Sequence, residues 1–364
     1  MWMVEDRNVT DTLHLLRKEI ARRNEKLEQL TDVELLVLDH IYFFAREHQD
    51  SVPGFERAVH RQIIEHIPLM SRKKNPMQFL VRWSNTIAEV EFPSWENIKK
   101  ITSAFLNEAN ESRDLNQVIA ADIIYSLAPR LMQPQRANML EDTFAHRYLD
   151  AILEAIFGSA PQLSCDWANG SLLRYKVQQK QQESNDSSNE DDAEETQEKP
   201  VINSTVFKPD WVVYAAAGPA LSAVGILELK VDYKRNPNYM TDFVKLAKEM
   251  KLILHQLIHA GVQEPIVCGI LIEGNRFETF AMDLTYDGIY RLLRLGKVRL
   301  CTTLREFSLF PAVFMDIMTV KDIALKTATS VEKCHCARQL GQATTGRTPI
   351  SWLRPSAGLI QRVD

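Results

Sequence analysis

Two apolar, strand-like runs in the middle of the chain constrain its fold most, because each carries charged residues near one end. The first run, 206–214, contains Asp210, and the second, 224–231, contains Glu228 and Lys230. Side chains two apart on a strand point to the same face, so Glu228 and Lys230 are expected to project together. If the runs pair as neighbouring strands, Asp210 can join them. Two carboxylates beside one ammonium group suit a hard divalent cation and a water molecule that the cation activates.

Helical and strand-like patterns surround these runs in the order helix, strand, strand, strand, helix, strand. Apolar residues recur at helical spacing over 141–157 and over roughly 240–260. Further strands are predicted within 163–177, over 266–272 and over 279–284. This order predicts an α/β fold in which a mixed sheet is flanked by helices.

The two ends of the chain have different patterns from the centre. Residues 1–135 are predicted to form an all-helical region, with Thr31, Ser94 and Asp114 as helix N-caps. Residues 136–327 are predicted to form the α/β domain, which would include a short helix over 289–295. Residues 328–364 have few periodic apolar residues and are predicted to be a flexible tail.

An acidic, low-complexity segment lies inside the predicted α/β domain. Residues 178–203 lack apolar periodicity, which predicts a disordered insertion. Residues 181–199 carry eight acids and one base, so removing them changes 48 acids and 43 bases to 40 acids and 42 bases. The net charge then changes from -5 to +2. This near-neutral remainder does not indicate a strongly basic surface for non-specific nucleic-acid binding.

Several classes of protein are disfavoured by the sequence. No uninterrupted apolar stretch approaches the ~18–20 residues that span a bilayer, and the N-terminus lacks a signal-peptide core, so an intracellular protein without a membrane partner is expected. The sequence has no P-loop or dinucleotide-binding glycine motif. Cys165, Cys268 and Cys301 are expected as free thiols, and the motif over 334–336 lacks the second ligand pair of a zinc site.

The pattern Pro209-Asp210 followed by Glu228-Leu229-Lys230 resembles the PD-(D/E)XK, or restriction-endonuclease-like, nuclease superfamily. The resemblance covers about 137–300 without the acidic segment, and the run over 267–293 is similar to uncharacterised fungal proteins and Crinkler-type effector domains. It implies a restriction-endonuclease-like α-β-β-β-α-β core. It also implies a magnesium site, which manganese could fill, with Asp210 and Glu228 as ligands.

The resemblance further implies roles for residues around this metal site. Lys230 would assist the attacking water, and Glu141 on the preceding helix would complete the catalytic set, with Asp142 or Asp150 as alternatives. Candidate nucleic-acid contacts are Lys234, Arg235, Lys248 and Arg147. The lysines at 245, 248 and 251 also fit an ordinary solvated helix face.

Two functions follow as expectations. The first is a metal-dependent nuclease that hydrolyses phosphodiester bonds, with DNA preferred over RNA. The alternative is a catalytically inactive nuclease-fold interaction or effector protein, which would bind a protein partner or itself through the N-terminal helices. A third interpretation also stays open, in which Asp210 is a turn residue and Glu228 and Lys230 form an exposed strand pair.

Overall fold

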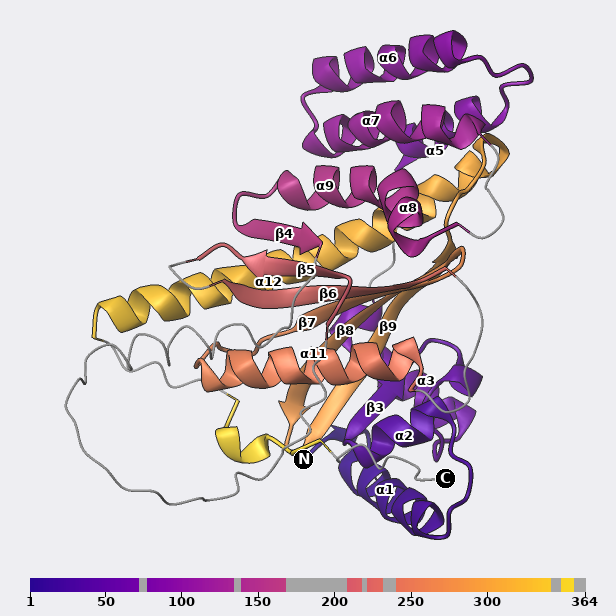
Figure 1. Cartoon of the computed structure of the whole chain (residues 1–364). Coiled ribbons are helices and arrows are strands. Elements are labelled where there is room, and N and C mark those ends of the chain that lie inside the picture. Colours follow the sequence, from indigo (N-terminus) through magenta and orange to yellow (C-terminus); the bar gives the residue numbers. More distant parts are fainter. Residues whose placement is uncertain are drawn as a thin grey trace, which may run out of the picture.

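A mixed sheet of seven strands forms the centre of the protein within the residues that the structure describes (Figure 1). The structure is a computed structural model, and it describes residues 1–71, 77–133, 139–167, 208–217, 221–231, 240–341 and 348–356. Helices lie on both sides of the sheet. The predicted α/β class with a mixed, helix-flanked sheet is confirmed. The predicted acidic insertion over 178–203 lies outside the described residues.

The strands follow the order β3–β9–β8–β7–β6–β5–β4 across the sheet. The pairs β3/β9 and β6/β7 are parallel, and the other neighbouring pairs are antiparallel. The strands are β3 (Ile41–Phe44), β4 (Leu163–Trp167), β5 (Trp211–Ala215), β6 (Ser222–Lys230), β7 (Val267–Glu273), β8 (Arg276–Tyr286) and β9 (Ile289–Arg299). The predicted strands over 206–214 and 224–231 therefore correspond to β5 and β6, which are direct neighbours.

Two long helices, α11 (Asp242–His259) and α12 (Phe310–Gln339), pack on opposite faces of the sheet. Adjacent residues of β7 show this, because successive strand side chains point to opposite faces. The thiol of Cys268 donates to the carbonyl of Val320 in α12 at 3.6 Å. A Cβ atom at Gly269 would instead collide with Met250 of α11, so glycine allows α11 to approach the strand closely.

Three predicted helix starts are confirmed by their N-caps. Thr31 and Glu34 form a capping box at the start of α2 (Asp32–Leu38). The side chains of Ser94 and Asp114 accept backbone N–H groups at the starts of α6 (Trp95–Ser112) and α7 (Leu115–Leu127). Short polar side chains in these positions satisfy amide groups that have no partner inside the helix.

The prediction that residues 1–135 are all helical needs correction, because β3 is an edge strand of the main sheet. Its four residues, from Ile41 to Phe44, are apolar, aromatic or β-branched and are all buried. The remaining helices of this region are α1 (Val9–Glu25), α3 (Arg57–Glu65), α4 (Pro68–Ser71) and α5 (Gln78–Ala88), and a two-stranded sheet joins β1 (Met3–Val4) to β2 (Arg7–Asn8). Helices α5 and α7 share a hydrophobic core with the central sheet, which includes Trp83 and Ile124 together with residues of β5 to β9, whereas α1 and α3 pack in a second core with Tyr42 and Phe44 of β3.

Two C-terminal predictions also need correction. Residues 289–295 belong to β9 and not to a short helix; β9 pairs with β8 after a turn at Gly288, whose φ is +65°. Both faces of this strand are covered, so its sequence lacks the alternation that identifies a half-buried strand. Helix α12 continues through Gln339, past the predicted start of a flexible tail at 328, because Ala328 and Val331 are buried against the core.

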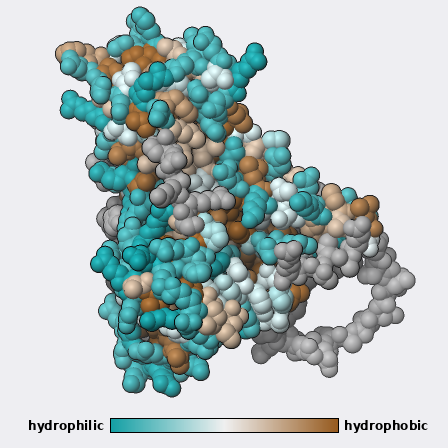
Figure 2. Space-filling model, turned by 180° about the vertical axis from the view of Figure 1, so that it is seen from behind, coloured by the Kyte–Doolittle hydropathy of each residue, from teal (hydrophilic) through white to brown (hydrophobic). Residues whose placement is uncertain are grey.

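The helix predicted over 141–157 is interrupted. It comprises α8 (Glu141–Phe144), a π-helical turn (Ala145–Leu149) and α9 (Asp150–Gly158). Helices α6 and α7 form a lobe at one end of the molecule, and α1 lies at the other end (Figure 1). The face seen from behind is mostly hydrophilic with scattered apolar residues (Figure 2). Among the described residues, no helix is both long and apolar enough to span a membrane.

Candidate active site

Asp210 is fixed to β6 just before β5 begins. Its N–H donates to the carbonyl of Leu227 at 3.1 Å, and its Oδ2 accepts the N–H of Leu229 at 2.7 Å. These two bonds flank Glu228, so Asp210 lies beside the backbone of Glu228. Burial raises the pKa of Asp210, and the hydrogen bond from Leu229 opposes this effect.

Glu228 points toward α11 and is only 3% exposed. Its Oε2 accepts the ammonium group of Lys245 at 2.7 Å, and the same ammonium donates to the carbonyl of Lys208 at 3.0 Å. Burial alone would lower the pKa of Lys245, but the nearby Glu228 raises it above its ordinary value. Lys245 is therefore a cation that ties α11 to β6 and to the segment before β5.

A third buried acid, Glu249, lies one turn along α11 from Lys245 and was not predicted. Burial raises the pKa of both Glu249 and Glu228, and the proximity of Glu249 raises that of Glu228 further. Among the described residues, Glu228 Oε1 and both carboxyl oxygens of Glu249 have no hydrogen-bond donor. Two ionised carboxylates have no proton to share, so this pair requires either a proton or a cation. The sequence signal was an acid on the apolar face of the helix, between Leu246 and Met250.

Lys230 is the last residue of β6 and is exposed. Its ammonium group donates to Glu141 Oε1 at 2.7 Å, and Glu141 is the first residue of α8. The structure thus brings together Lys230 and the first-choice helix acid. The alternatives, Asp142 and Asp150, instead lie 3.6 and 3.5 Å from the ring of His146. The hydrogen bond to Glu141 raises the pKa of Lys230, which keeps this side chain protonated at neutral pH.

The other lysines of α11 are not a solvated helix face. Lys248 is ion-paired with Asp39 at 2.8 Å, and Lys251 is fully buried, donating to the carbonyl of Asp39 at 2.8 Å. The interpretation of these lysines as an ordinary exposed face is therefore wrong. The side chain of Lys248 is 12% exposed, which leaves it little surface for the phosphate contact predicted from the sequence. Both residues fix α11 to the end of α2.

Of the remaining candidate nucleic-acid contacts, the structure describes Arg147 and does not describe Lys234 or Arg235. Arg147 lies in the π-helical turn at the surface and donates to the backbone carbonyls of Arg130 and Gln133 at 3.0 and 2.5 Å. Its guanidinium group is therefore held in a fixed orientation.

The carboxylates of the site have the chemistry that a hard cation requires. Within the described ranges, no three or more His, Cys, Asp or Glu side chains are arranged as a metal-ligand set. Magnesium, however, is commonly held by one or two carboxylates that act together with substrate phosphates, rather than by an all-protein cage. Asp210 and Glu228 supply two carboxylates, and Glu228 Oε1 is a buried oxygen without a donor. These residues therefore fit such an ion.

The cysteines do not form a second centre. Cys334 donates to the carbonyl of Ala260 at 3.1 Å, and all five cysteines are free thiols. Cys268 and Cys301 are buried as expected, whereas Cys165 is partly buried.

No family model, curated protein or solved structure matches the chain. Because function depends on sites rather than on folds alone, the cluster formed by Asp210, Glu228, Lys230, Lys245 and Glu249 is the candidate site from which a function is argued below.

Proposed function

We propose that the chain is a metal-dependent nuclease-like protein of the PD-(D/E)XK type, which hydrolyses phosphodiester bonds in nucleic acid, with DNA as the preferred substrate. One observation carries this proposal: Asp210 forms hydrogen bonds with the residues on either side of Glu228 in β6, and Lys230 is the last residue of that strand. The order of elements adds support. Helices α8 and α9 precede β4, β5 and β6, and α11 then crosses to β7, which is parallel to β6.

The residues of the cluster have separate roles in this reaction. Asp210 and Glu228 would hold a magnesium or manganese ion, together with the backbone carbonyl of Leu229. When bound, such an ion polarises the phosphate and makes water a better nucleophile. Lys230 is protonated near neutral pH, so it donates hydrogen bonds that orient the water and stabilise negative charge on the phosphate. Glu141 holds that ammonium group in position.

Lys245 and Glu249 set the charge of Glu228. The ammonium of Lys245 neutralises one oxygen of Glu228, and the adjacent Glu249 disfavours a second negative charge. Because Lys245 and Glu249 have opposing effects, the buried carboxyl group of Glu228 can exchange a proton for a cation. This arrangement is typical of functional sites, where burial and neighbouring charges together perturb pKa values.

A second function is favoured by one specific observation. Lys245 already compensates Glu228, so the cluster can exist as a structural ion network without a metal. The chain would then be a catalytically inactive nuclease-fold interaction or effector protein. In that case, Lys230 and Glu141 would form a surface ion pair whose loss costs no more than about 1 kcal/mol.

Cleavage of supercoiled plasmid and of single-stranded DNA, with magnesium or manganese, separates the two functions. Wild type should cut, the Asp210→Asn and Lys230→Ala variants should lose activity, and chelator should abolish it. Lys326→Ala is the matched control, because Lys326 is an exposed lysine on α12 far along the chain from the site. A folded wild type that neither cuts nor gains thermal stability from either metal would refute the nuclease and favour the interaction protein.

A further inference from the structure

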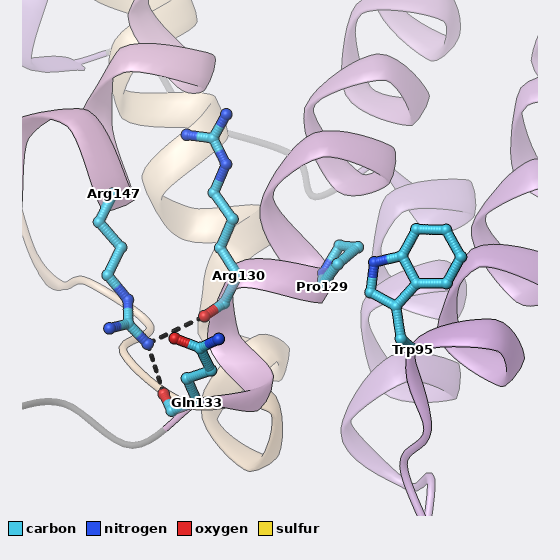
Figure 3. A pocket seen from close by; sticks show the side chains of 5 residues that line it. All are labelled: Trp95, Pro129, Arg130, Gln133 and Arg147. Atoms are coloured by element: carbon cyan, nitrogen blue, oxygen red, sulfur yellow. Dashed lines mark hydrogen bonds between the residues drawn. The ribbon is translucent and has the colours of Figure 1, made fainter.

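Two adjoining hollows lie where α6, the short 3₁₀ helix η2 (Ala128–Met132) and α8 meet. The first has a volume of about 340 Å³ and is lined by Trp95, Pro129, Arg130, Gln133 and Arg147 (Figure 3). The second has a volume of about 550 Å³ and shares both arginines; its other lining residues are Asp142, Thr143, His146 and Asp150. The two hollows therefore form one continuous surface with two guanidinium groups at its centre.

Both guanidinium groups are held by backbone carbonyls. Arg147 donates to the carbonyls of Arg130 and Gln133, in and just after η2 (Figure 3). Arg130 Nη1 donates to the carbonyl of His146 at 2.7 Å. Among the described residues, neither arginine has a carboxylate within ion-pair distance, whereas Arg291 is paired bidentately with Asp283. Because carbonyl bonds leave the positive charge uncompensated, Arg130 and Arg147 are oriented cations with further N–H groups to donate to an anion.

An exposed aromatic ring lies across the first hollow from these cations. Trp95 is 64% exposed, whereas the other five tryptophans of the chain are buried or partly buried. Its indole lies beside Pro129 and faces the hollow (Figure 3). The ammonium of Lys99 is 6.0 Å from the centre of this ring. An exposed indole beside fixed cations is suited to stacking on a nucleobase whose phosphates contact the cations.

The second hollow lies beside the helix that carries one residue of the candidate active site. Asp142, which lines the second hollow, follows Glu141 in α8, and Glu141 holds Lys230. We propose that these hollows bind single-stranded nucleic acid, with phosphates on Arg130 and Arg147 and a base stacked on Trp95. This inference rests on the proposed function and names its substrate class: a single strand laid over the hollows would enter the cluster at β6.

The composition of the surface favours a single strand over a duplex. Duplex DNA carries one charge per ~1.7 Å of helix axis, and binding to it requires many cationic contacts. Here two guanidinium groups share the second hollow with the acids Asp142 and Asp150. Stacking compensates for this weak electrostatic attraction, and only unpaired bases offer a free face. A phosphorylated peptide would use the same arginines but would not require the indole.

Fluorescence anisotropy with a labelled oligonucleotide of roughly 12 nucleotides tests the site. Chelator is included, so binding is measured without cleavage. Trp95→Ala should weaken binding by roughly ten- to a hundred-fold, as expected for one lost stacking contact, and Trp95→Phe should stay within about threefold of wild type. Phe92→Ala is the matched control, because Phe92 is 85% exposed and only three residues away but lines neither hollow.

Two further readouts report on the ring and on the charge. Single-stranded DNA should quench part of the intrinsic fluorescence, and Trp95→Phe should remove that component. Arg130→Gln should reduce the slope of log affinity against log salt by about 0.7, the value for one phosphate contact on a single strand. Thermal unfolding of each variant separates binding effects from loss of structure.

The inference is overturned by no binding to wild type, by equal binding to Trp95→Ala, by an equal effect of Phe92→Ala, or by tighter binding of the matched duplex. Displacement by a phosphopeptide that binds Trp95→Ala as well as wild type would assign the surface to a protein partner instead. Failure of the two proposals can be distinguished. Trp95-dependent binding without cleavage refutes only the nuclease, and cleavage that ignores Trp95 refutes only this surface.

Discussion

Replacing Lys245 with methionine removes the ammonium group that contacts the buried Glu228 and keeps a side chain of similar length. The two charged groups are 2.7 Å apart, with side-chain exposures of 26% for Lys245 and 3% for Glu228. Loss of one partner of a buried pair costs about 3–5 kcal/mol because the other charge is left uncompensated. The partial exposure of Lys245 places the expected loss of unfolding free energy at the lower end, about 3 kcal/mol.

The pH dependence of this loss has a defined sign. Burial raises the pKa of Glu228 to about 10 and that of its neighbour Glu249 to about 7, and Lys245 lowers both, so the Lys245→Met variant should raise the pKa of Glu249 further, into the range between pH 7 and 9. The folded variant then keeps a proton that the unfolded chain releases above its ordinary glutamate pKa. Its stability therefore falls as the pH rises, and the difference from wild type should be larger at pH 9 than at pH 6.

A double-mutant cycle measured by urea unfolding checks this reasoning. Glu228→Gln removes the charge that Lys245 compensates, so the double variant should be about 2 kcal/mol more stable than the sum of the single effects predicts. Lys326→Met, at an exposed site on α12, should stay within about 0.5 kcal/mol of wild type. Additive single effects, or an equal loss at pH 6 and pH 9, would refute the account of a compensated buried carboxylate.

Three further predictions follow from charges in and around α11. Burial lowers the pKa of Lys251 to about 8, so the folded chain loses this proton at a lower pH than the unfolded chain does. The unfolding free energy of wild type should therefore rise by up to about 1.4 kcal/mol per pH unit between pH 8 and 10. Urea unfolding of Lys251→Met should show no such rise. Glu141→Gln should lower the pKa of its lysine partner at the end of β6, and an NMR titration of the lysine ammonium groups with no downward shift would contradict their pairing. Magnesium should raise the thermal stability of Lys245→Met more than that of wild type, because the ammonium group and the metal compete for the same carboxylate. Magnesium should leave the thermal stability of Glu228→Gln unchanged. An equal response in all three proteins would place the metal elsewhere.

Local sequence patterns predicted the elements that carry the site. The strands β5, β6 and β7 and the helix α11 each have a continuous apolar pattern within one segment, and Thr31 and Ser94 mark helix starts through bonds to nearby backbone. The edge strand β3 was missed because its partner, β9, lies about 250 residues further along the chain. Its four apolar residues follow a helix without any turn signal, so only the long-range pairing distinguishes them from a continuing helix.

In the candidate site, too, the residues set by local sequence patterns were predicted and those set by long-range packing were not. The spacing of Asp210, Glu228 and Lys230 is visible in the sequence because strand geometry fixes which residues share a face. Glu249 was not predicted and Lys245 was interpreted as a solvated lysine, because a charged residue on a helix has the same local pattern whether it faces solvent or another buried charge. Only the packing of α11 against β6 removes Glu249 and most of Lys245 from water.

The same ammonium group of Lys245 makes both proposed functions physically reasonable, and the choice between them depends on what compensates the buried carboxyl pair. Glu228 and Glu249 cannot both stay ionised without a cation or a shared proton. If the ammonium of Lys245 and one proton are sufficient to compensate the two carboxyl groups, the cluster is a stable structural network whose charges balance without a metal or a substrate. If a divalent ion replaces them, Lys245 still has the carbonyl of Lys208 at 3.0 Å and the carboxylate of Glu249 at 3.9 Å as partners. Displacing Lys245 from Glu228 therefore does not leave its ammonium group unpaired. A site that exchanges an internal cation for a metal requires such a second set of partners for the displaced cation.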